Sequence, residues 1–485
     1  MTRAILAAVA VAALAAGGYA WFAAGQAAGP AIEIRQPERF VGRTAVFEAT
    51  VDSPDGRLTA LDAFIEQDGS HQLFALEDAG DTETRQETAT RLRLVRRFDR
   101  ESHPELRAGP ATVVVRATRP VLFGLRETSS ETSVAVEVRL DPPRLTPLSR
   151  FHYVNHGGAE FIVYRVAPND VESGVEVGDR FYPGYDAAGA LAAAAASGVA
   201  SPLESAGAGL EGGDGLRVAL FALAHDQDLG TPMRLYARDP AGNEARAPFD
   251  HRVFDREFRR SRIQVGEGFL RRVVPAIAAN APELADEEVD AASDLGDLLD
   301  LYLFVNGELR RRNSATVAAL AAETEPRWLW QGPFRQLANS QVESGFADHR
   351  TYFHAGDEID QQVHLGFDLA STANAPIRAA NAGRVIFADY LGIFGNCVVV
   401  DHGMGLQSLY AHLSTIDVAI GDAVAREDTL GLSGQTGLAG GDHLHFTMLL
   451  HGEPVTPVEW WDEHWIEDRI LRKLREAPAA DGGGP

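Results

Sequence analysis

Four histidines and one aspartate in the last third of this 485-residue chain lie in three short motifs that suit metal chemistry. The motifs are HLGFD at 364–368, YAHL at 410–413 and HLH at 443–445. Alternation along a strand would place His443 and His445 on the same face. Imidazole nitrogens and a carboxylate oxygen are preferred ligands of a catalytic Zn²⁺, which takes three protein ligands and keeps one position open. Two histidines then remain to move protons or stabilise charge beside the metal.

Each motif taken alone is ambiguous. His364 and Asp368 are four positions apart, so an extended segment would put them on one face, and Gly366 disfavours a helix there. The same residues could form a hydrogen-bonded turn without a metal. HLH could be a polar strand face with two exposed histidines, and His412 could pack beside Tyr410. The metal hypothesis therefore rests on the conjunction of the three motifs.

The elements that must position these residues are strands separated by glycine turns. In the segment 440–450 two glycines lead into a strand on which His443, His445 and Thr447 share one face and the alternate apolar residues face the core. An apolar strand at 397–400 and a turn at 401–405 precede the YAHL motif. This pattern predicts an antiparallel β domain.

The order of the motifs resembles that of the lysostaphin/LytM-type zinc metalloendopeptidases, which cut peptidoglycan peptides. The resemblance spans about 334–457, roughly a quarter of the chain. It implies that His364, Asp368 and His445 hold Zn²⁺ and that His412 and His443 are the catalytic pair. Which of the pair acts as general base stays open. The implied substrates are peptidoglycan stem peptides or cross-links.

The chain departs from the family pattern in one place. GGDHLHFTM stands where STGPHLHFE is commoner, so that Asp442 precedes the first histidine and Thr447 follows the second. Neither position is an expected ligand, and we expect Asp442 to orient or charge-pair His443. Cys397, the only cysteine, lies in an apolar strand, where a buried inert thiol is expected instead of a nucleophile.

Composition limits the function classes. The net charge of −25 argues against nucleic-acid binding, because such a surface repels phosphate backbones. A single cysteine rules out an intrachain disulfide. Lys473 is the only lysine, so arginine carries nearly all the positive charge.

The N-terminus predicts export. Residues 4–24 carry no charge and follow Arg3, which fits a span of about 20 residues with a cytoplasmic N-terminus. Tyr19, Trp21 and Phe22 favour an uncleaved anchor in the inner membrane; a cleaved signal peptide is the alternative. With the resemblance, this predicts a periplasmic protein.

The remaining patterns predict a multidomain, mainly β chain. Alternating strands upstream indicate two immunoglobulin-like β-sandwich domains, and amphipathic periodicity then indicates helices. The expected divisions are 1–28, a signal-anchor or transmembrane segment; 29–145, a β-sandwich domain; 146–254, a second immunoglobulin-like β domain with an Ala/Gly-rich loop; 255–327, a helical segment; 328–470, the LytM-type zinc peptidase domain; and 471–485, a tail.

Three other hypotheses remain open from sequence. The domain could be a non-hydrolytic activator of a cell-wall amidase, as some relatives of the family are, or the β domains could make the chain a scaffold. The segment 328–360 could also cover the metal and add a ligand from Asn339, Glu343 or Asp360. A periplasmic regulatory protein is a possible partner.

Overall fold

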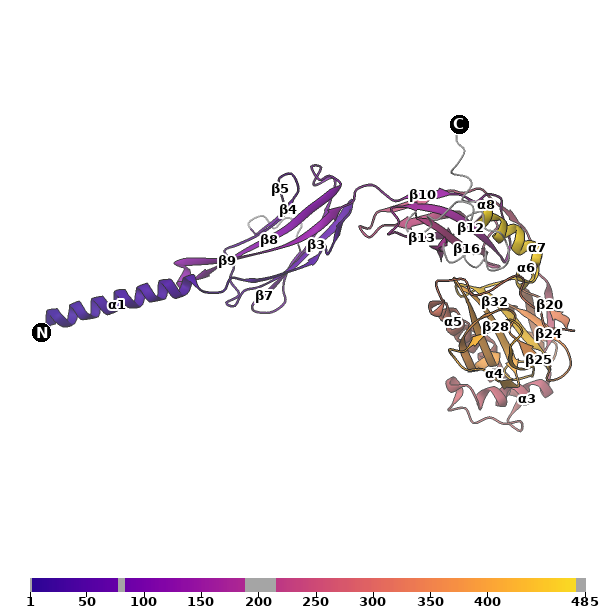
Figure 1. Ribbon diagram of the computed structural model, residues 1–485. Coiled ribbons are helices and arrows are strands. Elements are labelled where there is room, and N and C mark those ends of the chain that lie inside the picture. The colour runs from indigo at the N-terminus through magenta and orange to yellow at the C-terminus, as the bar shows by residue number, and fades with distance from the viewer. Residues whose placement is uncertain (1, 77–82, 188–214, 477–485) are drawn as a thin grey trace, which may run out of the picture. The chain divides into compact units, whose positions relative to one another are not determined.

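The computed structural model describes residues 2–76, 83–187 and 215–476 (Figure 1). They form two compact units. One comprises Met1–Pro143 and Arg238–Ala245, and the other comprises Arg144–Ala237 and Arg246–Pro485. Both are mainly β, as the sequence predicted. The predicted Ala/Gly-rich loop lies, apart from its two ends, outside the described residues.

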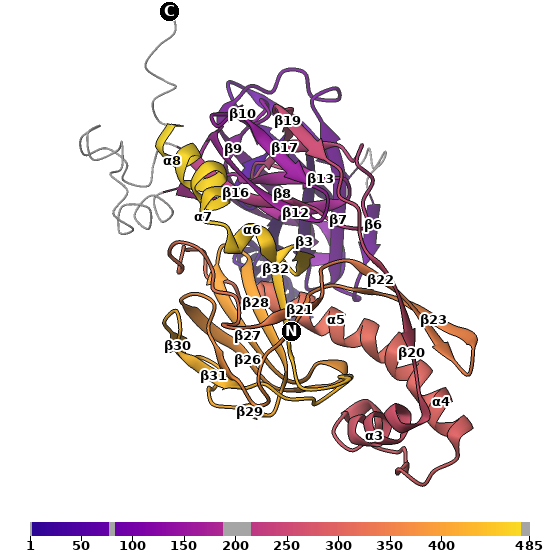
Figure 2. The same cartoon turned by 90° about the vertical axis from the view of Figure 1, so that its right-hand side faces the viewer.

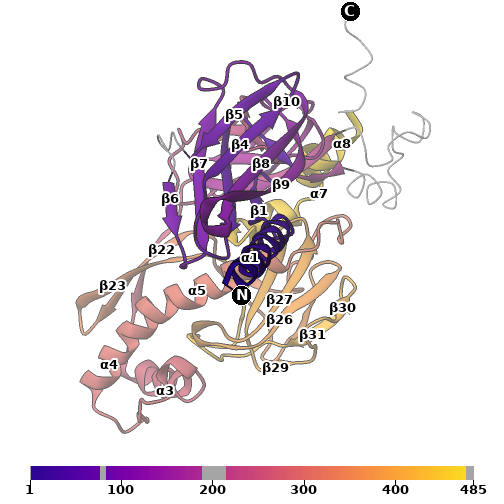
Figure 3. The same ribbon diagram turned by 90° about the vertical axis from the view of Figure 1, so that its left-hand side faces the viewer.

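The first unit begins with the apolar helix α1 (Thr2–Gly25). By length and composition, Arg3–Gly25 is able to cross a membrane, a test that a signal sequence also passes. Its alanine-rich sequence favours a helix. α1 leads into β1 of the same unit (Figure 3). Near the end of the helix, the Arg126 guanidinium donates to the Trp21 carbonyl at 2.8 Å, which ties the helix to the following β structure.

Two sheets pack around one core in this unit. Phe47 and Ile65, one from each sheet, are fully buried, as expected for strands with one face inward. In spatial order the sheets are β1 (Ala31–Gln36), β3 (Thr44–Asp52), β7 (Arg91–Asp99), β6 (Glu83–Gln86), and β2 (Phe40–Val41), β9 (Arg126–Val138), β8 (Gly109–Val121), β4 (Ala60–Glu66), β5 (Ser70–Ala75), with η1 (Leu122–Gly124) between β8 and β9.

The second unit opens with another β region that shares its hydrophobic core with the C-terminal domain. Phe161 packs edge-on against Trp328 at a ring-centroid distance of 6.2 Å. The sheets are β10 (Arg144–Pro147), β12 (Gly158–Ala167), β16 (Leu216–Leu223), β15 (Tyr185–Asp186); β14 (Arg180–Pro183), β13 (Glu172–Val177), β17 (Met233–Arg238), β18 (Glu244–Ala247); and the pair β11 (His152–Asn155), β19 (His251–Phe254).

Helices follow, as the periodicity predicted, and lie beside the large C-terminal sheet (Figure 2). Asp294 caps one of them by accepting from the Gly296 amide at 2.8 Å. Their apolar faces bury Leu270, Leu298 and Tyr302 in a small core. The elements are β20 (Arg260–Gln264), α3 (Glu267–Ala278), η2 (Pro282–Leu284), α4 (Leu295–Phe304), η3 (Val305–Leu309), α5 (Arg310–Ala319) and η4 (Leu320–Glu323).

The C-terminal domain is built on a large antiparallel sheet whose two faces have different partners. One face carries Phe446 in the shared core, whereas the other packs Leu409 and Leu449 against Val317 of α5. In order, its strands are β21 (Gln341–Ser344), β24 (Phe367–Ala370), β32 (Leu444–Leu450), β28 (Leu406–Leu413), β27 (Gly395–Gly403), β26 (Gly383–Leu391) and β30 (Ala423–Val424), with β33 (Glu453–Val455) paired to β32.

Two smaller sheets and a helical tail complete this unit. β20 joins β22 and β23 beside the helices, so the upstream segment is bonded into the domain. The segment expected as a tail contains a helix up to Glu476, and its Lys473 is buried. The elements are β22 (Asp348–His354), β23 (Asp357–His364), β25 (Pro376–Arg378), β31 (Thr429–Leu432), β29 (Thr415–Ile416), η5 (Gly392–Phe394), α6 (Pro457–Trp461), α7 (Glu463–Ile466), η6 (Glu467–Leu471) and α8 (Arg472–Glu476).

Candidate metal centre

Three neighbouring strands bring His364, Asp368 and His445 together. His364 ends β23, Asp368 lies in β24, and His445 lies directly opposite Asp368 in β32. His364 Nε2 is 2.9 Å from Asp368 Oδ1 and 2.9 Å from His445 Nδ1, and the latter two atoms are 3.0 Å apart. All three residues are buried.

The hydrogen bonds made by the outer ring nitrogens of His364 and His445 determine which nitrogen of each ring carries the proton. His364 Nδ1 is 3.1 Å from the Gly345 carbonyl, which can only accept, so Nδ1 carries the proton. The Thr447 hydroxyl donates to the Leu365 carbonyl and therefore accepts from His445 Nε2 at 3.1 Å. Each imidazole thus turns a lone pair inward beside a carboxylate oxygen. Three acceptors and no donor converge, an arrangement that a cation satisfies.

The donor set fits Zn²⁺. Two imidazoles and one carboxylate leave a fourth position open, and atom separations of 2.9–3.0 Å are close to the roughly 3.3 Å expected for tetrahedral ligands at ~2.0 Å. Burial opposes ionisation of Asp368, but the neighbouring imidazoles of His364, His443 and His445 outweigh it and lower the pKa of this carboxyl well below its usual range. Burial lowers the pKa of His445 to about 4. Both groups are therefore deprotonated near neutral pH, as metal ligands must be.

A guanidinium holds the second oxygen of the aspartate. Arg350 of β22 donates through Nη2 to Asp368 Oδ2 at 2.7 Å and also lies 3.6 Å from Asp348. This contact leaves Oδ1 directed at the two histidines. Arg350 thus orients the carboxylate, as groups behind metal ligands commonly do.

A β-bulge brings His412 to the same face. Alternation along β28 places Ala411 on the side of the metal ligands and Tyr410 on the opposite side of the sheet. The same alternation would place His412 on the side of Tyr410, away from the ligands. Instead two residues of β28 lie opposite one residue of β27, and His412 has a φ of 64°. Its ring centroid lies 4.8 Å from that of His443 and 5.8 Å from that of His445.

His412 and His443 both direct Nε2 toward the centre. Their Nδ1 atoms lie 2.8 Å from the Thr436 carbonyl and 2.9 Å from the Gly441 carbonyl, so each Nδ1 carries the proton. Burial and the neighbouring histidines lower the pKa of His412 well below its usual range. Burial opposes protonation of His443, but the Asp368 carboxylate 3.5 Å away outweighs this effect. The pKa of His443 is therefore higher than its usual value. The two histidines therefore differ in proton affinity.

One sequence-based expectation is wrong. Asp442 does not pair with His443; its carboxylate accepts from the Ser433 hydroxyl at 2.6 Å and from a backbone amide. Of the upstream residues considered as extra ligands, Asp360 accepts a hydrogen bond from Asn306 at 2.6 Å. Among the described His, Cys, Asp and Glu side chains, the ligand atoms that converge are those of His364, Asp368 and His445. That the segment 328–360 covers the metal stays a prediction.

Arg350 and Thr447 are the contributors that sequence reasoning missed. Thr447 was placed on the correct strand face by alternation, but its bond to His445 depends on β24 lying alongside β32. Arg350 gave no local signal, because its partner Asp368 is 18 positions away. Cys397 is fully buried and burial raises the pKa of its thiol, in agreement with an inert role.

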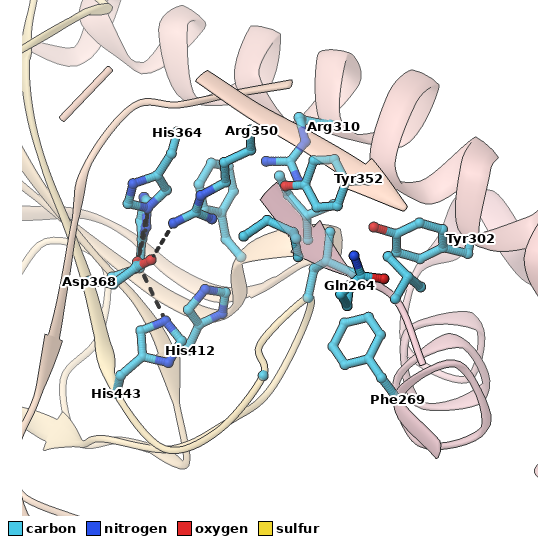
Figure 4. Close-up of a pocket in the computed structure, with 17 residues that line it drawn as sticks. Gln264, Phe269, Tyr302, Arg310, Arg350, Tyr352, His364, Asp368, His412 and His443 are labelled. Carbon is cyan, nitrogen blue, oxygen red and sulfur yellow. Dashed lines mark hydrogen bonds and ion pairs between the residues drawn. The ribbon is translucent and has the colours of Figure 1, made fainter. Parts of the chain in front are cut away.

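A cavity of about 240 Å³ opens beside this centre (Figure 4). His412 and His443 line it together with the three grouped residues. The opposite side of the cavity is formed by residues of β20, α3, α4 and the first residue of α5, all of which precede the three histidine motifs in the chain. We call the part of the chain from β20 to α5 the upstream segment. The metal centre therefore faces a recess whose far wall is this segment.

Comparison with known proteins identifies the domain. Residues 362–457 match Peptidase family M23. The DD-carboxypeptidase/endopeptidase Mpg of Neisseria meningitidis serogroup B is 38% identical over 97 residues, which are 20% of this chain and 22% of that protein. The murein hydrolase activator EnvC of Escherichia coli is 34% identical over 106 residues, which are 22% of this chain and 25% of that protein. The chain thus matches about a quarter of the length of these curated relatives.

The catalytic domain of lysostaphin from Staphylococcus simulans is a neighbour with 25% identity and a TM-score of 0.23, covering 26% of this chain and 94% of that chain. The resemblance predicted from three motifs is confirmed over residues 362–457, where the chain carries a Peptidase M23 domain.

Proposed function

We propose that this chain is a zinc-dependent endopeptidase that hydrolyses peptide bonds in peptidoglycan stem peptides or cross-links. The observation that supports it most is the convergence of His364 Nε2, Asp368 Oδ1 and His445 Nδ1 within 3.0 Å, all three as acceptors. The name of another relative, the peptidoglycan DD-endopeptidase ShyA of Vibrio cholerae, which is 36% identical over 96 residues, supports the substrate class.

The chain's residues divide the work in this proposal. His364, Asp368 and His445 would hold a zinc ion, which would supply Lewis acidity to polarise a scissile carbonyl and lower the pKa of water. His412 and His443 present Nε2 to the same recess. There one ring, unprotonated at Nε2, takes a proton from the attacking water, and the other, protonated at both ring nitrogens, donates from Nε2 to the developing oxyanion. The burial of the centre strengthens these charge interactions.

The alternative is a non-hydrolytic activator of a cell-wall amidase. The likeness to the activator EnvC favours it, because that relative is 34% identical to this chain over 106 residues. The two functions make opposite demands on the metal ligands: a hydrolase needs them, whereas stimulation of an amidase by docking does not.

Mutation of one ligand separates the two functions. We expect the full chain in detergent micelles to contain about one zinc and to release muropeptides from purified sacculi, and His445→Ala to lose both. His464→Ala is the matched control, since its side chain is 97% exposed at the surface. Stoichiometric zinc without cleavage, together with amidase stimulation that survives His445→Ala, would establish the activator instead.

The proposal extends to the rest of the chain. We infer that α1 anchors the protein in the inner membrane and that the remainder lies in the periplasm. We also infer that the β regions within 29–145 and 146–254 are immunoglobulin-like domains, and that residues 255–327 join them to a peptidase domain at 328–470. Membrane extraction at alkaline pH and the mass of the mature chain test the anchor: a soluble protein lacking its first residues would establish a cleaved signal.

A further inference from the structure

The cavity beside the metal centre has a polar wall that the hydrolytic chemistry does not use. Figure 4 shows Tyr302 and Gln264 across the cavity from Asp368 and His443, with Arg310 and Tyr352 along the same wall. Tyr302 comes from α4, Arg310 begins α5 and Tyr352 lies in β22. All precede residue 362, where the match to Peptidase family M23 begins.

Arg310 is held in place on one side only. Its Nε donates to the Asn306 carbonyl at 3.0 Å and its Nη2 to Asn306 Oδ1 at 2.6 Å. Asn306 in turn donates to Asp360 at 2.6 Å. In the described part of the chain no acceptor pairs with the Nη1 atom of Arg310. The guanidinium is thus oriented by its own helix and keeps donor capacity for a ligand.

Two tyrosine hydroxyls add to this wall. Tyr302 is 1% exposed and Tyr352 is 6% exposed, and their rings pack edge-to-face at 6.5 Å. Within the described ranges neither hydroxyl has a hydrogen-bond partner, although both residues line the cavity. A buried tyrosine normally finds a partner for its hydroxyl, so these two are available to a bound group.

The charge of the lining selects the kind of group. Arg310 and Arg350 contribute two guanidinium groups, whereas the lining includes one carboxylate, that of Asp368. Asp368 is already paired with Arg350. A recess with this local balance attracts an anionic part of a substrate, although the chain as a whole carries a net charge of −25.

We propose that Arg310, Tyr302 and Tyr352 form a subsite that binds a free carboxylate of the peptide substrate beside the scissile bond. The proposal rests on the proposed function, since it assigns the part of the substrate that the upstream segment recognises. A carboxylate accepts from a guanidinium and from hydroxyls at once, whereas an amide in its place presents one acceptor and two donors. The subsite thus selects acidic over amidated peptides.

Matched peptides test this selection directly. The probes are a synthetic cross-linked stem peptide with free carboxylates and the same peptide with every carboxylate converted to the amide. Binding is measured by calorimetry on the full chain in detergent micelles after chelation of metal, and hydrolysis on the zinc-loaded protein. We expect the acid to bind roughly 10- to 100-fold more tightly than the amide, as for a hydrogen bond to a charged group.

Single substitutions show which residues produce the preference for the acid over the amide. We expect Arg310→Gln to bring the acid-to-amide ratio close to one, and Tyr302→Phe or Tyr352→Phe to lower it several-fold. Arg312→Gln is the matched control: it removes a charge from the same helix, but its side chain is 53% exposed and pairs with Glu308. The tyrosine variants keep the ring packing, so they remain informative even if Arg310→Gln unfolds.

The outcomes separate this subsite from the hydrolase itself. An acid-to-amide ratio near one in the unmodified chain, or a ratio unchanged by Arg310→Gln, would overturn the subsite. Acid preference in the metal-free protein that disappears in Arg310→Gln supports it, even if the zinc-loaded protein hydrolyses neither peptide. In that case the proposed hydrolase fails and the subsite stands.

Discussion

Replacing Lys473 with methionine should destabilise the second unit strongly. This single lysine of the chain donates through Nζ to Glu160 Oε1 at 2.6 Å and to the Phe161 carbonyl at 2.9 Å. The side chains of Lys473 and Glu160 are 4% and 0% exposed. The pair thus joins α8 to β12 in a buried site, where the loss of one partner leaves a buried charge.

The expected loss is about 3–5 kcal/mol, the usual cost of removing one member of a buried ion pair. Two backbone amides would still donate to Glu160, each at 2.7 Å, so its carboxylate keeps partial satisfaction. The double variant Lys473→Met/Glu160→Gln should recover part of the loss, because it removes the uncompensated charge although one of the two backbone amides loses its acceptor.

Tryptophan fluorescence during urea unfolding measures this loss in the correct unit. Five of the six tryptophans lie between residues 328 and 465, and Trp330 and Trp460 are in the shared core. Arg472→Met is the control, since its ion pair with Asp468 is about half exposed and should contribute less than about 1 kcal/mol. A loss below about 1 kcal/mol in Lys473→Met, or single losses that simply add in the double variant, would refute the reasoning.

Three further predictions concern charge and metal. Burial raises the pKa of Glu459 from 4.5 to about 7, so the folded chain binds a proton there that the unfolded chain has lost. The free energy of unfolding should therefore fall by roughly 3 kcal/mol as the pH rises from about 4.5 to 7. Glu459→Gln should abolish this dependence in unfolding free energies measured from about pH 4 to 8. Arg350→Leu should weaken zinc binding about 10- to 100-fold, because Asp368 Oδ2 loses its donor; competition with a zinc-sensitive dye measures this, and an unchanged affinity would exclude an orienting role. Chelation should lower the melting temperature of the zinc-loaded chain, since zinc at 100 times its Kd adds about 2.7 kcal/mol, and His364→Ala should remove this response; an equal response in the variant would place the metal elsewhere.

Local sequence patterns correctly predicted the features that depend only on neighbouring residues. Alternation placed His443, His445 and Thr447 on one strand face, and an uncharged run predicted α1. Amphipathic spacing predicted helices where α3, α4 and α5 lie. These features follow from the 2.0- and 3.6-residue periods of the backbone, which a sequence displays directly.

The tertiary structure decided what depends on register and on distant contacts. His412 joins the centre through a bulge set by the pairing of β27 with β28, whereas alternation alone directs it to the opposite face. Asp442 turns to Ser433 and away from the histidine beside it. Arg310 reaches the cavity because the upstream segment is bonded to β22, a pairing without local periodicity. The sequence by itself determined which groups could bind a metal, and the fold decided which of them meet, because strand register and packing between distant segments arise only in the assembled chain.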